Sequence, residues 1–206
     1  MINVSDSLLG GIGFGFAGLL GVWIAQYLGR NDASLEDGPA QIPLSPWLVV
    51  VFTAAIGVSL TAHHLSPMQL GATGFFLIAL VAAATSDCAF GLVPDMFTLL
   101  PLAIFLCASL LQHHYEPLLS AMVVALPFAL LACFSHGRGM GWGDVKMAAF
   151  AGAVLPPNAI LFASFLAVGA TFAISRISRP SSGTGVAFVP YFASAIGMVL
   201  LLGSGF

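Results

Sequence analysis

The sequence predicts an all-α integral membrane protein, a polytopic bundle of about eight transmembrane helices. Hydrophobic residues make up 59% of its 206 positions, charged residues make up only 6%, and the mean hydropathy is +1.04. Because a soluble protein carries about 25% charged residues, this chain cannot cover a surface that faces water. Long apolar runs separated by short polar breaks also follow one another along the chain.

Each apolar run is interpreted as one membrane-spanning helix, which needs about 20 apolar residues. The first run has no Lys or Arg ahead of it, so we expect a retained helix rather than a cleaved signal peptide. The predicted spans are 8–28, 47–65, 67–86, 96–111, 118–135, 142–155, 159–177 and 189–205. They are separated, in order, by polar, glycine or proline breaks at 30–32, 66–67, 87–95, 113–117, 135–141, 156–157 and 176–185.

Two of these runs, 96–111 and 142–155, are short for a span. They are interpreted as tilted, partly interfacial or extended by neighbouring residues, and seven spans is the nearest alternative. The only long connection, 29–46, is too short to form a domain. We therefore interpret residues 1–206 as a single transmembrane domain.

Basic residues orient this arrangement in the membrane. With eight spans, all four arginines fall in loops on one side, Lys146 lies at the same edge, and the opposite loops contain neither Lys nor Arg. Such loops face the cytoplasm in most membrane proteins. The predicted cytoplasmic loops are 29–46, 87–95, 135–143 and 176–188.

The composition also excludes several classes of function. Five Lys and Arg residues cannot form the basic face that a nucleic-acid-binding protein needs. The three cysteines are isolated, so neither a disulfide framework nor a zinc site is indicated. We expect a lipid bilayer around the chain, no nucleic acid partner and no bound metal.

Three acidic residues, Asp87, Asp95 and Asp144, lie at the ends of apolar runs on the predicted cytoplasmic side. A carboxylate at the centre of a bilayer costs about 2.5–3.5 kcal/mol and less near its surface, so intramembrane acids are candidates for function. Asp95 follows Pro94 at the start of a predicted helix. Its simplest interpretation is an N-cap that accepts backbone N–H groups.

Asp144 lies in the string GMGWGDVK, residues 139–146, with glycine at three alternate positions. Glycine costs about 1 kcal/mol relative to alanine in a helix, so we expect a sharp turn or a close approach of another segment here. On the helix that follows, Asp144 shares a stripe of small residues with Ala148, Ala151 and Gly152.

Asp87 shares a similar stripe with Ala79, Ala83 and Ala84, so the two helices can bring Asp87 and Asp144 together. Two carboxylates at hydrogen-bond distance cannot both ionise comfortably, and we expect the pair to hold one proton, as in an aspartic protease. The alternative is structural: Asp144 begins a helix, Lys146 extends toward the membrane surface, and Asp87 is a polar group that ends a helix.

Three motifs resemble the type IV prepilin peptidases, a family of intramembrane aspartic proteases with a GxGD motif. They are GWGDVK at 141–146, DCAFGLVPDMFT at 87–98 and FVPY at 188–191. The resemblance implies that Asp87 and Asp144 are the catalytic pair, which needs no cofactor. It also implies that Gly141, Gly143, Lys146 and Asp95 shape the site where the substrate binds.

The resemblance further implies a substrate, the short basic leader of a prepilin or pseudopilin. This leader would be cut after a glycine, at the cytoplasmic face of the bacterial inner membrane, next to pilus or secretion machinery. The acidic residues Asp32, Glu36 and Asp37 of the 29–46 loop are expected to help recruit it. Longer family members carry a domain with two CxxC pairs in this place, so we predict a peptidase that does not methylate its product.

Two other functions remain open from the sequence. One is a catalytically silent membrane partner in pilus or secretion assembly. The other is a small proton-coupled transporter, which would use intramembrane acids as a relay. A relay would place the acids along a path across the membrane, whereas Asp87 and Asp144 gather on one face.

Overall fold

The computed structural model describes residues 4–31, 45–63, 67–134, 141–178 and 188–202, and all its regular elements there are α-helices. Each helix overlaps one predicted span, which confirms the all-α prediction. The helices are α1 (Val4–Asn31), α2 (Pro46–Ala62), α3 (Pro67–Phe90), α4 (Asp95–Leu111), α5 (Glu116–Phe134), α6 (Trp142–Val154), α7 (Pro157–Ser178) and α8 (Val189–Leu201).

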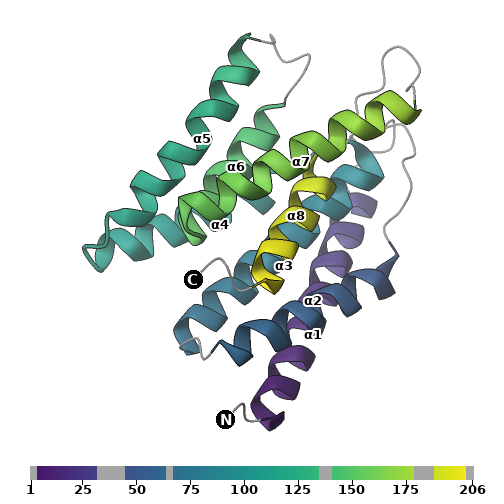
Figure 1. The fold of residues 1–206 in the computed structure, drawn as a ribbon, viewed down its shortest axis with the longest axis vertical. Helices are drawn as coiled ribbons and strands as arrows, with labels where there is room; N and C mark the ends of the chain where they lie inside the picture. The colour runs from purple at the N-terminus through teal and green to yellow at the C-terminus, as the bar shows by residue number, and fades with distance from the viewer. Residues whose placement is uncertain (1–3, 32–44, 64–66, 135–140, 179–187, 203–206) are drawn as a thin grey trace.

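The helices form two groups with α8 between them (Figure 1). The first group is α1, α2 and α3, in which α1 packs against both of the others. The second contains α4, α5, α6 and α7, in which α6 packs against its three neighbours. Helix α8 contacts α7 of the second group and α2 and α3 of the first. The second half of the chain therefore reaches α3 directly.

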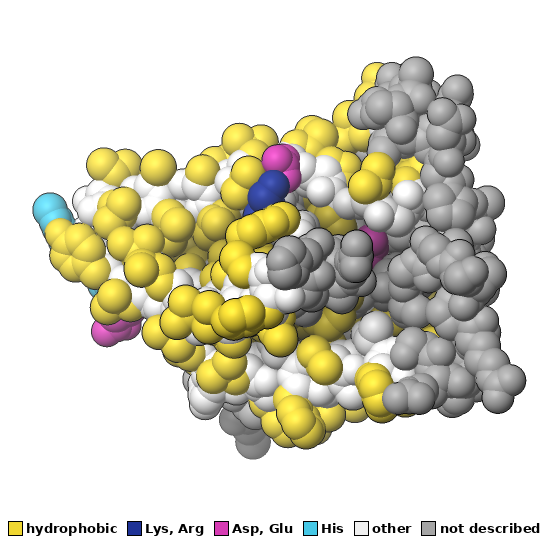
Figure 2. Space-filling model, turned by 90° about the horizontal axis from the view of Figure 1, so that it is seen from above, with side chains coloured by type: hydrophobic (Ala, Val, Ile, Leu, Met, Phe, Trp, Pro, Cys, Tyr) yellow, Lys and Arg dark blue, Asp and Glu magenta, His cyan; other side chains and the backbone are white. Residues whose placement is uncertain are grey.

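Length and composition identify the protein as a membrane protein. Within the described residues, α1, α3, α5 and α7 each contain an apolar stretch of at least 18 residues, which is long enough to cross a bilayer. Helices α2, α4 and α8 are apolar but shorter. Hydrophobic side chains cover most of the described surface in Figure 2, as expected of a surface that faces lipid.

Helix α6 is, together with α8, one of the two shortest described helices. Its 13 residues extend about 20 Å, at 1.5 Å per residue, which is less than the ~30 Å hydrocarbon core. Met147, Ala148, Phe150 and Ala151 on this helix are fully buried. The predicted span 142–155 is therefore a short internal helix that other helices surround.

The predicted loop 87–95 is wrong in its extent. Helix α3 continues to Phe90, and the connection to α4 contains only residues 91–94. Gly91 ends the helix because its φ of 67° lies in the left-handed region that glycine adopts without strain. Its N–H donates to the carbonyl of Asp87 at 2.9 Å. Asp87 thus lies in the last turn of a helix, where its backbone is fixed.

The residues on which the predicted orientation rests lie largely outside the described part of the chain: Arg138 and Arg179, together with the side chains of Arg30 and Arg176. The acids predicted to recruit the leader, Asp32, Glu36 and Asp37, also lie outside it. The cytoplasmic placement of the loops and the role of the 29–46 loop therefore stay predictions.

A glycine sets the distance between α5 and α6. A Cβ atom added at Gly152 would lie 2.9 Å from the Cβ of Val124 and 3.1 Å from the carbonyl oxygen of Ser120, both on α5. The small-residue stripe of α6 therefore faces more than one neighbour, because Gly152 packs on α5 while Asp144 lies near α3.

We predict that Gly152→Ala lowers the free energy of unfolding by about 1–3 kcal/mol, because a side chain there overpacks the α5–α6 contact. Gly169→Ala on α7 is the matched control, since an added Cβ there meets nothing within 4 Å. It is expected to leave the stability unchanged or slightly higher. Denaturant titration of both variants in bicelles measures the difference, and equal stabilities would contradict the tight α5–α6 contact.

Candidate active site

Asp87 is a buried carboxylate held by the start of another helix. Only 7% of the residue is exposed, and its Oδ2 accepts a hydrogen bond from the backbone N–H of Val189 at 3.1 Å. Val189 is the first residue of α8, where backbone N–H groups lack partners within the helix and the helix dipole favours a negative charge. Helix α8 thus compensates part of the cost of burying this acid.

Small residues allow α8 to approach this end of α3. Ala79, Ala83 and Ala84, the predicted stripe of small residues next to Asp87, are buried at 6% exposure or less. A hydroxyl one residue before Asp87 also holds the turn that follows, because Ser86 Oγ donates to the carbonyl of Leu92 at 2.9 Å. The position of Asp87 is therefore set by both α8 and the 91–94 turn.

Asp144 lies in the first turn of α6 and is partly buried. Its Oδ2 accepts a hydrogen bond from the backbone N–H of Gly141 at 3.1 Å, and its own N–H donates to the carbonyl of Gly141 at 3.2 Å. This reciprocal arrangement resembles a capping box, in which an acidic side chain reaches back to the residue before the helix. The carboxylate is therefore fixed relative to the axis of α6.

The two described glycines next to Asp144, Gly141 and Gly143, do not have unusual backbone angles. Gly141 has an extended conformation with φ of −81°. An added Cβ at Gly143 would lie 3.4 Å from the Cβ of Val93, in the turn between α3 and α4. That distance is an ordinary van der Waals contact, so the expected close approach is not seen at Gly143; the expected sharp turn is not seen at Gly141, and Gly139 lies outside the described residues.

The fold brings Asp87 and Asp144 together. Helices α3 and α6 contact each other, and the two carboxylates are close enough to interact electrostatically. Each accepts one backbone N–H at the start of a helix, although the two residues are 57 positions apart in the sequence. Within the described residues, no group of three His, Cys, Asp or Glu side chains could hold a metal ion. No hydrogen bond joins the two carboxylates among the described contacts, so the expected hydrogen-bond distance between them is not seen, but two nearby carboxylates can serve as a general acid and a general base.

The N-cap interpretation of Asp95 is wrong. The N-cap of α4 is Pro94, and Asp95 is the first helical residue. Its carboxylate forms an ion pair with Lys146, with 2.5 Å between Oδ1 and Nζ, instead of capping the helix. The side chain of Asp95 is 60% exposed and that of Lys146 is 30% exposed. Figure 2 shows a basic side chain next to an acidic one on an otherwise largely hydrophobic face.

This ion pair joins the two segments that carry the acids. Asp95 begins the helix after the 91–94 turn, and Lys146 lies two residues after Asp144. Together with the contact between Val93 and Gly143, it holds the end of α3 next to the start of α6. The structure therefore places the predicted site residues Asp87, Asp95, Gly141, Gly143, Asp144 and Lys146 in one region of the bundle.

Sequence reasoning from spacing missed the role of Val189. Apart from the resemblance carried by FVPY at 188–191, the signal was Pro190, since proline near the start of an apolar run is typical of the first turn of a helix. A helix N-terminus is in turn a place where an anion binds. Those two rules predict an anion near residue 189, but they do not identify Asp87 as that anion.

Two comparisons with known proteins agree on one family. The family model described as "Type IV leader peptidase family" matches residues 74–176, which is half of the chain. The "Prepilin leader peptidase/N-methyltransferase" of Dichelobacter nodosus is 28% identical over 169 residues, which cover 76% of this chain. The aligned region spans 57% of that relative's length. No solved structure matches the chain.

We predict a small energetic coupling between Lys146 and Asp95, because an ion pair with exposed side chains typically contributes about 1 kcal/mol or less. The measurement is a double-mutant cycle of unfolding in bicelles with Lys146→Met, Asp95→Asn and the double variant. The control combines Lys146→Met with Glu116→Gln, an exposed acid at the start of α5, and is expected to be additive. A coupling above about 3 kcal/mol would show a buried, rigid pair instead.

Proposed function

The chain belongs to the type IV leader peptidase family, and we propose that it is an aspartic endopeptidase that removes the leader peptide of type IV prepilins or pseudopilins. The observation that carries this proposal is the pair of carboxylates, Asp87 and Asp144, which interact electrostatically inside a helical membrane protein. Asp87 is not needed to end its helix, because Gly91 ends α3, whereas the side chain of Asp144 also accepts a backbone N–H at the start of α6.

The proposed mechanism uses one ionised and one protonated aspartate. The ionised carboxylate takes a proton from a water molecule, which attacks the carbonyl carbon of the scissile peptide bond. The protonated carboxyl donates a hydrogen bond to the carbonyl oxygen and polarises it. The proton taken from water then passes to the leaving amine as the peptide bond breaks. In each carboxylate Oδ2 accepts the backbone N–H, which leaves Oδ1 for the water or the substrate.

Four neighbouring residues are proposed to shape the substrate site. Gly141 and Gly143 present backbone without side chains next to Asp144, so an extended peptide can approach the acid closely. Lys146 and Asp95 border the same region with opposite charges. The exposed carboxylate of Asp95 is suited to attract a basic leader.

The site is proposed to lie at the cytoplasmic face of the bacterial inner membrane, where the predicted basic loops would place the ends of α3 and α6. The proposed product would pass to pilus or secretion machinery. Methylation of the product is not part of the proposal, because the connection between α1 and α2 contains no cysteine. If the well-folded wild-type protein cleaves no leader peptide, the alternative of a catalytically silent membrane partner in pilus or secretion assembly is favoured instead.

We predict that Asp87→Asn and Asp144→Asn each lower the rate of leader cleavage by at least about 10²-fold, because each removes a group that transfers a proton. The assay is cleavage of a prepilin reporter in membranes, measured by gel shift and by sequencing the new N-terminus. Glu116→Gln is the matched control and should cleave at the wild-type rate, since this acid is exposed on α5.

Equal amounts of each variant in the membrane, and equal thermal stability in detergent, must accompany the loss of activity. Cleavage that persists in both aspartate variants would refute the two-aspartate mechanism.

A further inference from the structure

The first turn of α8 presents a single backbone donor to α3. Helix α8 begins at Val189, whose N–H donates to Asp87 Oδ2 at 3.1 Å. Pro190, the next residue, has no N–H to offer. The N–H groups of the two residues that follow Pro190 both donate to the carbonyl of Phe188 at 3.1 Å. Within this turn, the N–H of Val189 is therefore the donor that reaches the buried carboxylate.

Aromatic packing holds this donor in place. The rings of Phe188 and Phe192, on either side of Val189 in the sequence, stack with 5.6 Å between their centroids. The ring of Phe128 on α5 lies 6.1 Å from the first and 6.2 Å from the second, within the range of favourable aromatic pairs. All three residues are at most 8% exposed, and Val189 is fully buried. The location of the donor is thus set by packing against α5 as well as by its bond to α3.

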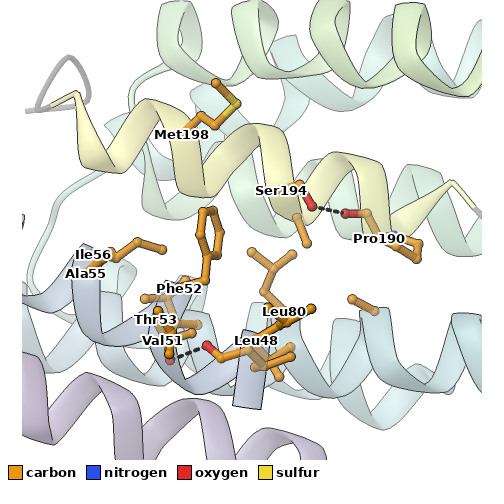
Figure 3. A pocket seen from close by; sticks show the side chains of 15 residues that line it. Leu48, Val51, Phe52, Thr53, Ala55, Ile56, Leu80, Pro190, Ser194 and Met198 are labelled. Carbon is orange, nitrogen blue, oxygen red and sulfur yellow. Dashed lines mark hydrogen bonds between the residues drawn. The ribbon is translucent and has the colours of Figure 1, made fainter. Parts of the chain in front are cut away.

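The surface next to this turn offers no donor in exchange. An apolar groove with a volume of about 510 Å³ lies between α2, α3 and α8, and none of the side chains that line it is charged (Figure 3). Ala84, which lines it on α3, is one helical turn before Asp87. The two hydroxyls of the lining, on Thr53 and Ser194, each donate to a carbonyl of their own helix at 2.8 Å. The groove therefore holds no group that replaces the N–H of Val189.

The bond to Val189 orients the carboxyl plane of Asp87. The last torsion of an aspartate side chain is soft, so a fixed donor on Oδ2 determines where Oδ1 points. From these contacts we propose that the N–H of Val189 is a positioning group for peptide-bond cleavage, which holds Asp87 in the orientation that the reaction needs. This inference rests on the proposed peptidase function. Removing the N–H slows the chemical step and leaves substrate binding intact, because the buried Val189 acts through Asp87.

The direct test replaces the N–H of Val189 by an oxygen atom. The α-hydroxy analogue of valine, introduced by cell-free translation with a suppressor tRNA into nanodiscs, keeps the side chain and forms an ester in place of the peptide bond. The kcat for cleavage of a prepilin reporter is expected to fall at least about tenfold, with KM within about twofold. A bond that only joins α8 to α3 would instead lower the thermal stability and leave kcat unchanged, which would overturn the proposal.

An ester in place of the N–H of Tyr191 is the matched control. The ester at Val189 also weakens the carbonyl of Phe188 as an acceptor, and the N–H of Tyr191 donates to that same carbonyl. The control thus removes a hydrogen bond from the same turn without affecting the bond to Asp87, and both constants should stay within about twofold of the wild-type values. Equal losses of kcat in the two esters would contradict the positioning role.

Failure of this inference is distinguishable from failure of the proposed function. If the positioning role alone is wrong, Asp87→Asn and Asp144→Asn are inactive while the Val189 ester cleaves with the wild-type kcat. Cleavage by both aspartate variants would refute the two-aspartate mechanism itself.

Amide hydrogen exchange tests the bond without turnover. Nuclear magnetic resonance of the isotope-labelled protein in bicelles follows the N–H of Val189 in the wild type and in Asp87→Ala. Exchange is expected to be at least about tenfold faster in the variant, because the N–H loses the acceptor that protects it. The N–H of Tyr191, bonded within its own turn, should exchange at the same rate in both proteins. Equal rates at Val189, or the same acceleration at Tyr191, would overturn the proposal.

Discussion

The hydrogen bond between Asp87 and the N–H of Val189 connects the two groups of helices and fixes the candidate site. A carboxylate that is 93% covered requires compensation, and the N-terminus of α8 supplies a donor together with a favourable dipole. The same helix packs against α2, α3 and α7. The location of α8 therefore determines where the acid is held and how the second half of the chain meets the first.

The hydrogen bond between Asp87 and Val189 requires that the helices pack closely. Ala83 on α3 and Ala148 on α6 are fully buried, and larger side chains in their place would overpack the interior of the bundle. A short α6 serves the same purpose. Because α6 does not cross the membrane alone, its first turn can lie inside the bundle at the depth of the end of α3.

The sequence was sufficient to predict the helices and to place Asp87 and Asp144 at the ends of two helices that contact each other, whereas their role as a catalytic pair stays a prediction. Apolar runs indicate spans, and stripes of small residues indicate which helix faces pack closely. The errors arise where a tertiary contact decides. Lys146, 51 residues away, binds Asp95, which the sequence alone assigned to an N-cap. The bond from the N–H of Val189 to Asp87 depends on how α8 crosses α3, and no local pattern encodes a crossing angle.

The two sides of the aspartate pair differ in chemistry, and this difference suits the proposed substrate. On one side, the groove lined by α2, α3 and α8 carries no charge. On the other, the starts of α4 and α6 carry an ion pair whose Asp95 carboxylate is largely exposed. A basic leader would be attracted to the side of Asp95 and would gain no charge interaction on the other. The asymmetry would thus orient the chain across Asp87 and Asp144, so that one peptide bond, rather than its neighbours, meets the two acids.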